Sequence, residues 1–140
     1  MYDRFHAPHD AAVTRVTYVS GDSWNVNPVA LKWVERLFCR NERAVLRLRF
    51  TSGGHPVALV PVAAILAAGI RLHFLDVVMN MNYFRCGRNR LFDARATGRR
   101  AGLVRARATI IVFAPRGFRL CDGIADGTTI RMGQSLKVLP

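Results

Sequence analysis

The stretch Ala44-Val45-Leu46-Arg47-Leu48-Arg49-Phe50-Thr51, residues 44–51, alternates apolar and polar side chains, most of the polar ones arginines. Such a period of two is typical of a strand with one buried and one solvated face. The turn Ser52-Gly53-Gly54-His55 follows, and then an apolar run from Val57 to Ala68. The pattern predicts a β-hairpin with its arginines in water.

The segment before this hairpin predicts one strand and one helix. Val13 to Ser20 alternates in the same way and is followed by the turn residues Gly21-Asp22-Ser23. Asn27 is a good N-cap and Pro28 suits the first helical position. Apolar residues then recur at three- and four-residue spacing, which predicts one short helix near residues 28–39 with its apolar face in the core. We expect the same burial for Trp24 and Trp33.

The second half of the chain is less regular. From Met79 to Arg107 arginines and asparagines interrupt every period, so we expect a long surface excursion with little regular structure. Thr109 to Phe113 predicts a strand, and Leu136 to Leu139 predicts a final edge strand. The fold class that follows is mainly β (α+β), antiparallel, with one domain over residues 1–140.

Charge is the most unusual bulk property. The chain carries a formal charge of +12, and all but two of its 21 basic residues are arginine. A charge of this size attracts anionic partners such as phospholipid head groups or nucleic acid. GC-rich codons explain an arginine-rich composition at least as well as function does.

Cysteines and apolar segments limit the remaining classes. Cys39, Cys86 and Cys121 show no paired spacing that would indicate zinc or a disulfide framework. The longest apolar stretch, 56–70, is shorter than the roughly 20 residues of a membrane span. We therefore expect a cytoplasmic chain, with peripheral contact to the cell membrane as an open alternative.

Several motifs resemble those of the phosphatidylserine decarboxylase family, in the family's order. They are Arg4-Phe5-His6-Ala7-Pro8, Trp24-Asn25-Val26-Asn27-Pro28, Leu37-Phe38-Cys39-Arg40-Asn41-Glu42-Arg43, Thr109-Ile110-Ile111-Val112-Phe113-Ala114-Pro115 and Ile130-Arg131-Met132-Gly133-Gln134. The resemblance covers most of the chain, with 79–107 as its weakest part. It implies a decarboxylase-like domain, N-terminally truncated relative to a full-length member.

The resemblance also implies a particular chemistry. Family members cut themselves at a serine within Gly-Ser-Thr and convert that serine into a pyruvoyl cofactor, which carries the decarboxylation. In this sequence the three motif positions fall on Arg107, Ala108 and Thr109. A methyl group cannot serve as the nucleophile, so we expect no self-processing and no pyruvoyl cofactor.

A histidine is the processing base in the family, and the resemblance places it at His6, which corresponds to the family's second conserved histidine. Asp3 occupies the position of the first histidine, and the orienting aspartate would precede Met1. His6 and His9 also form an HxxH pair, but no third metal ligand lies nearby. Without the family match, a lone histidine here would be a solvated residue.

The expected function is a phosphatidylserine decarboxylase-like protein, of a carboxy-lyase family, that does not process itself. The alternative is a basic, non-catalytic module that binds anionic phospholipid or nucleic acid. A membrane surface containing phosphatidylserine is the favoured partner, because arginines without stacking aromatics are a weak signal for nucleic acid. Association with a full-length homologue is a further expectation.

Overall fold

The computed structural model describes residues 2–64, 70–72, 77–79, 90–92, 96–97, 100–105, 109–131 and 133–138. It is strand-rich and its paired strands are antiparallel, which confirms the predicted fold class.

The larger sheet has the strand order β10-β4-β3-β2-β7, and β8 also pairs with β2. Its strands are β2 (Ala11–Val19), β3 (Arg43–Phe50), β4 (Pro56–Val62), β7 (Arg90–Phe92), β8 (Ala96–Thr97) and β10 (Thr109–Phe113). The centre is the predicted hairpin β3–β4, in which Leu46 pairs with Leu59 and Arg47 with Ala58. Alternation along β3 buries its leucines and leaves Arg47 and Arg49 exposed, as the sequence predicted.

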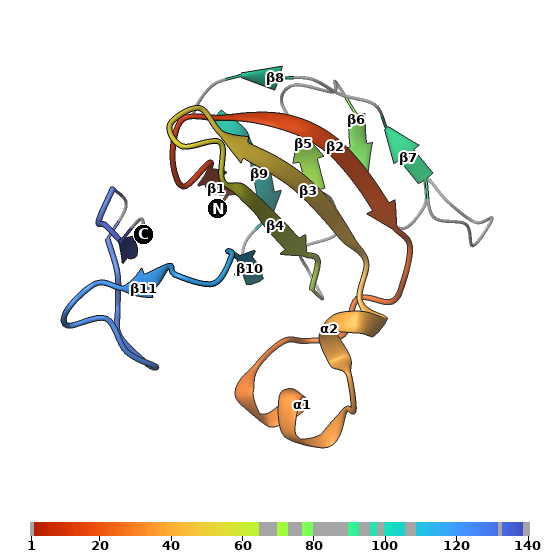
Figure 1. The fold of residues 1–140 in the computed structure, drawn as a ribbon. Helices are drawn as coiled ribbons and strands as arrows, with labels where there is room; N and C mark the ends of the chain where they lie inside the picture. The colour runs from red at the N-terminus through yellow and green to blue at the C-terminus, as the bar shows by residue number, and fades with distance from the viewer. Residues whose placement is uncertain are drawn as a thin grey trace.

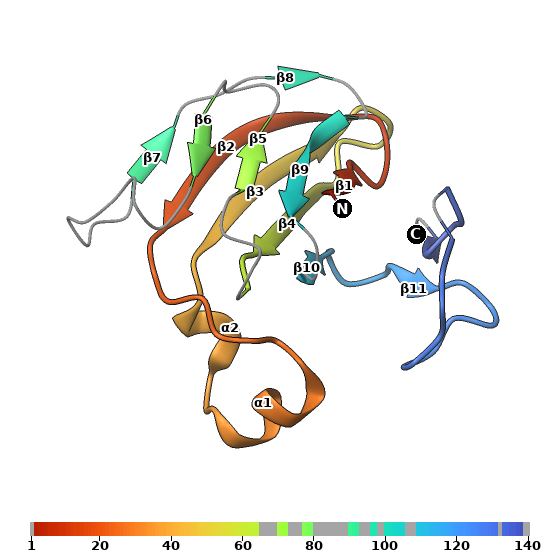
Figure 2. The same cartoon turned by 180° about the vertical axis from the view of Figure 1, so that it is seen from behind.

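A smaller sheet has the order β1-β9-β5-β6. Its strands are β1 (Tyr2–His6), β5 (Ile70–Leu72), β6 (Val77–Met79) and β9 (Arg100–Arg105). It lies behind β2, β3 and β4 in Figure 1 and in front of them in Figure 2, so the two sheets form two layers. Between them lies one cluster of buried residues that includes Val16, Leu46, Leu59, Ile70 and Leu72.

The helical segment differs from its prediction. The predicted helix is divided into α1 (Pro28–Trp33) and α2 (Leu37–Arg40), because Val34 is extended and Arg36 adopts a left-handed conformation with φ 54°. Asn27 caps α1 as predicted, since its side chain accepts a hydrogen bond from the Ala30 N–H at 2.7 Å.

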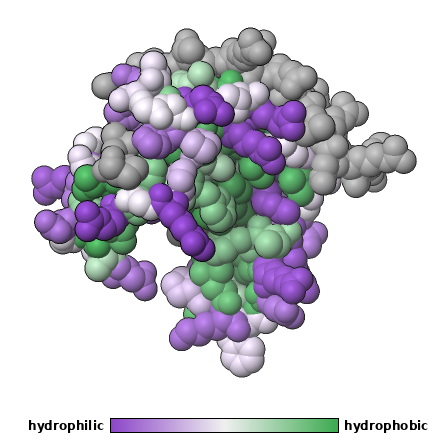
Figure 3. Space-filling model, viewed as in Figure 1, coloured by the Kyte–Doolittle hydropathy of each residue, from purple (hydrophilic) through white to green (hydrophobic). Residues whose placement is uncertain are grey.

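Burial of this segment was also predicted wrongly. No residue of α1 is buried and Leu37 is the one buried residue of α2. Trp24 and Trp33, which we expected in the core, are both exposed. We call residues 23–40 the helical lobe; it hangs from the end of the larger sheet in Figures 1 and 2. Figure 3 shows apolar surface over that sheet continuing onto the lobe.

The expectation of little regular structure over 79–107 is wrong for β7, β8 and β9. These strands pair with β2, β1 and β5 through their backbones. β7 and β8 pair only with β2, whereas β9 lies between β1 and β5. All three ladders are made by backbone groups, which need no hydrophobic period, and this is why the sequence pattern missed them.

The C-terminal part agrees with its prediction. β11 (Arg119–Leu120) pairs with β12 (Lys137–Val138), which lies within the predicted edge strand. Within the described ranges, no helix has the length and apolar character to span a bilayer.

Candidate functional site

The segment that leads into the processing position is bounded by two strands. β9 ends at Arg105 and β10 begins at Thr109, while Arg107 and Ala108 lie outside the described residues. Thr109 is half-buried and pairs with Val62, which pairs with Arg43. One row of the larger sheet therefore connects the start of β10 with the start of β3.

β1 runs antiparallel along β9. Asp3 lies opposite Val104, near the end of β9 that leads toward residue 107, whereas His6 lies opposite Arg100 after a register shift. The two positions on β9 are about 13 Å apart along the strand, at 3.3 Å per residue. His6 is half-buried and its Nδ1 is buried without a hydrogen-bond partner. The register thus places Asp3, rather than His6, beside the C-terminal part of β9, the strand that precedes residues 106–108 in the chain.

A buried polar cluster, formed by Asn41 and Glu42, lies at the same end of the larger sheet as Thr109. Asn41 is fully buried, and its Oδ1 accepts a hydrogen bond from the Trp24 N–H at 2.9 Å. Its Nδ2 donates to the Trp24 and Ala63 carbonyl oxygens at 2.8 and 2.9 Å. This side chain therefore ties the start of the helical lobe to the end of β4.

Glu42 is the second buried member of this cluster. The Tyr18 hydroxyl donates to Glu42 Oε1 at 2.6 Å, and Oε2 is buried without a partner. Burial raises the pKa of Glu42, and the hydrogen bond from Tyr18 opposes that shift. Burial, followed by the hydrogen bond to Glu42, also raises the pKa of Tyr18. The pair therefore favours a neutral carboxyl group.

The neighbours of this pair hold the chain close together. Arg43 Nη1 donates to the carbonyl oxygens of Cys39 and Asn41 at 2.6 and 3.0 Å. Gly21 lies so close to the Arg40 carbonyl oxygen that a Cβ would approach it to 2.2 Å. A side chain at residue 21 would therefore force the two segments apart.

Known proteins resemble this chain over nearly its whole length. The profile of the family described as phosphatidylserine decarboxylase matches residues 1–138. The chain belongs to the phosphatidylserine decarboxylase family. Three proteins named phosphatidylserine decarboxylase proenzyme, of similar sequence, come from Xanthomonas axonopodis pv. citri, Aliivibrio fischeri and Myxococcus xanthus. They are 33%, 30% and 26% identical over 96%, 94% and 99% of this chain.

The chain spans about half the length of these phosphatidylserine decarboxylase relatives, 49%, 48% and 49% respectively. The contacts of Asn41, Glu42 and Arg43 give this motif a structural role that the sequence did not predict, because in the sequence it was only one of the motifs that carry the resemblance. The available signal was two polar residues directly before a strand of buried leucines.

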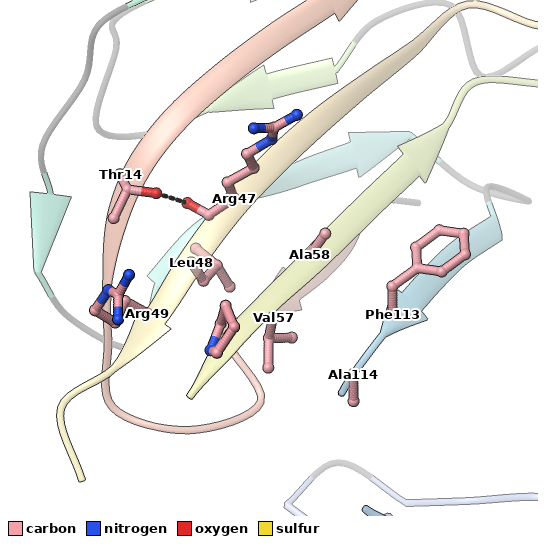
Figure 4. A pocket seen from close by; sticks show the side chains of 9 residues that line it. Thr14, Arg47, Leu48, Arg49, Val57, Ala58, Phe113 and Ala114 are labelled. Atoms are coloured by element: carbon pink, nitrogen blue, oxygen red, sulfur yellow. Dashed lines mark hydrogen bonds between the residues drawn. The ribbon is translucent and has the colours of Figure 1, made fainter. Parts of the chain in front are cut away.

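An open pocket of about 450 Å³ lies on the face of the β3–β4 hairpin that carries Arg47 and Arg49. Thr14 and Phe113 are also among the residues that line it. Thr14 Oγ1 donates to the Arg47 carbonyl oxygen at 3.1 Å. Arg49 Nη1 donates to the Gly54 carbonyl oxygen at 3.0 Å. Figure 4 shows the two arginine side chains pointing away from each other. The pocket is therefore no preformed site for a single phosphate, which needs converging donors.

Two further histidines, His9 and His55, pack against aromatic rings. His9 lies 5.3 Å from the Phe50 ring and His55, just after the hairpin turn, lies 5.5 Å from Phe118, measured between ring centroids. Among the described residues no group of three histidines, cysteines or carboxylates is placed to hold a metal ion. His73 and Cys86 lie outside the described residues.

Proposed function

We propose that this chain is a phosphatidylserine decarboxylase-like protein that keeps the family fold and does not process itself. The relatives that it matches are named as proenzymes of the decarboxylase, and their chemistry would reach this chain only through a pyruvoyl group. The observation that carries the proposal is Ala108 at the position of the cofactor-forming serine.

The chemistry explains why one residue is decisive. Self-processing needs a side-chain oxygen that first attacks the preceding carbonyl carbon and then leaves as part of the new acyl group. Ala108 has no such oxygen, so the residues present do not fit a pyruvoyl cofactor. The hydroxyl of Thr109 is one residue out of register and lies on a residue paired in β10.

Arg107 adds a second obstacle at the position of the family glycine. Glycine reaches backbone conformations that a residue with a Cβ rarely adopts, and it allows close approach of the neighbouring chain. Asp3 supplies a carboxylate where the family has a histidine. Three of the positions that the family uses for processing therefore carry residues of different chemistry.

A denaturing gel with intact-mass measurement tests the proposal. The purified chain should run as one band, and its mass should be that of the uncleaved chain, 15.7 kDa. The proposal fails if the chain is cleaved near residue 108 into two fragments and the smaller fragment has a blocked N-terminus.

The second candidate function is a basic module that binds anionic phospholipid. It is favoured by the +12 charge and by β2, β3, β4 and β10, which contain four arginines and no acidic residue. It is compatible with the first candidate, because lipid binding needs no pyruvoyl group. Association with a full-length homologue is a further proposal that cross-linking of the two chains would test.

A further inference from the structure

The outward face of the larger sheet places two arginines directly opposite each other. β3 buries its leucines, so Arg47 and Arg49 lie on the face away from the core. On β2 a register irregularity lies just before Arg15, which is exposed and is the cross-strand partner of Arg47. Residues in this relation have Cβ atoms about 5 Å apart, and like charges there destabilise a sheet. Arg15 and Arg47 form no ion pair with any residue in the described ranges, so a bound anion would stabilise them.

An exposed aromatic ring lies in the same row of the sheet. Arg47 pairs with Ala58 on β4, and Ala58 pairs with Phe113 on β10, so the three side chains share one face. Phe113 is 58% exposed, and all three residues line the open pocket. Figure 4 shows them on neighbouring strands, with the small Ala58 between the ring and the guanidinium group. The sequence did not show this aromatic residue among the arginines, because the strand pairing brings it there.

The shape of this surface limits the ligand that it fits. The row from Arg15 to Phe113 crosses four strands, which is about 14 Å at the usual strand spacing. The guanidinium groups of Arg47 and Arg49 point away from each other, which suits an extended chain with several anionic groups rather than one small anion. The exposed ring in turn suits a planar apolar group. We call these residues the arginine face: Arg15, Arg47, Arg49, Ala58 and Phe113.

We propose that the arginine face binds single-stranded nucleic acid. Its arginines contact successive phosphates, and one unpaired base stacks on the Phe113 ring. A duplex keeps its bases stacked on each other, and an acidic peptide has charges without bases, so neither uses both features of the face. The inference goes beyond both candidate functions. It depends neither on Ala108 nor on lipid binding, so its test and theirs fail independently.

Fluorescence anisotropy with a labelled oligothymidine tests the arginine face. The full chain should bind an oligomer of about 20 nucleotides, which is longer than the site of one small domain. Binding should weaken with added salt, and the logarithm of the association constant should fall against the logarithm of the salt concentration with a slope of about −2 for three phosphate contacts. Heparin, a polyanion without bases, is the comparison ligand.

The aromatic ring separates base stacking from charge. Phe113→Ala should weaken oligothymidine binding about tenfold, the effect of losing one base stack, and should leave the salt slope unchanged. Its affinity for heparin should equal that of the unchanged chain. Trp33→Ala is the control, because Trp33 is an exposed aromatic residue on the helical lobe. This control should bind oligothymidine like the unchanged chain.

The opposed arginines are tested by the salt slope. Arg15→Gln with Arg47→Gln should reduce its size by about 1.4, or about 0.7 for each phosphate contact that is lost. Arg36→Gln with Arg40→Gln changes the charge equally on the helical lobe and should leave the slope unchanged. Because Arg15 and Arg47 repel each other, their replacement should not lower the midpoint of thermal unfolding. That measurement separates lost binding from lost folding.

Four results would overturn the inference. The first is that the full chain does not bind oligothymidine at low salt. The second is that Phe113→Ala binds oligothymidine like Trp33→Ala, or loses heparin to the same extent. The third is that both arginine pairs change the salt slope equally. The fourth is binding to anionic vesicles or to polyglutamate in place of oligothymidine.

Discussion

The carboxyl group of Glu42 makes the stability of the chain depend on pH in a defined direction. Burial raises the pKa of Glu42 in the folded chain, whereas an unfolded glutamate titrates near about pH 4.3. Its contribution is therefore fully present below about pH 4.3 and is lost as the pH rises through the raised pKa of the folded state. Between these two values the folded chain holds a proton that the unfolded chain has released.

We expect Glu42→Gln to remove this dependence. The amide keeps an oxygen that can accept the Tyr18 hydroxyl, and it does not ionise. Relative to the unchanged chain, the free energy of unfolding of the variant should rise by up to about 1.4 kcal/mol for each pH unit between the unfolded and folded pKa values of Glu42. Urea unfolding from about pH 4 to pH 8 measures the difference. Glu35→Gln, at an exposed ion pair, is the control, and equal slopes for both variants would refute the assignment.

Asn41 supports a second prediction at the scale of elements, because its side chain joins the helical lobe to β4. Asn41→Ala removes three hydrogen bonds and leaves the Trp24 and Ala63 backbone groups without that partner. The expected loss in the free energy of unfolding is about 3 kcal/mol. The substitution should also speed amide hydrogen exchange more in residues 23–40 than in β3.

Asn25→Ala is the matched control for Asn41. Asn25 Oδ1 accepts a hydrogen bond from the Asn27 N–H at 3.0 Å in an exposed turn. Its loss should cost about 1 kcal/mol or less. If the two variants lose equal stability, or if exchange in the lobe is unchanged by Asn41→Ala, the bracing role of Asn41 is wrong.

The elements also show which parts of the fold were predictable. The hairpin β3–β4 was, because its buried leucines and exposed arginines follow the strand period of two. The helix was divided and exposed, although its spacing indicated a core-facing helix, because the break at Arg36 depends on the fold around it and not on a local pattern. Strands β7 to β9 pair through their backbones, and a side-chain pattern does not record that.

At the scale of the whole molecule, the sequence points to a candidate site only where chemistry requires one residue type, and that site stays a prediction because residues 107 and 108 lie outside the described part of the chain. Ala108 and Arg107 stand out against a motif whose chemistry demands serine after glycine. The opposite holds for Asn41 and Glu42, whose roles come from contacts with Trp24, Ala63 and Tyr18, all 17 or more residues away. Long-range contacts of this kind require the folded chain.

The register of β1 on β9 leads to a prediction about restoring the processing chemistry. Arg107→Gly with Ala108→Ser supplies the nucleophile, but it leaves a carboxylate at residue 3, opposite Val104. A positioned general base typically contributes 10²–10⁴-fold. Adding Asp3→His to the double substitution should therefore speed self-cleavage by about 100-fold or more, measured by band intensity over time.

His6 provides the comparison that decides between the two positions. It lies opposite Arg100, about 13 Å further along β9 than the partner of Asp3. If residue 3 is the position of the base, His6→Ala in the triple-substituted chain should change the cleavage rate little. If His6→Ala abolishes cleavage while Asp3→His adds nothing, the base acts from residue 6, and the strand register does not determine which histidine takes the proton.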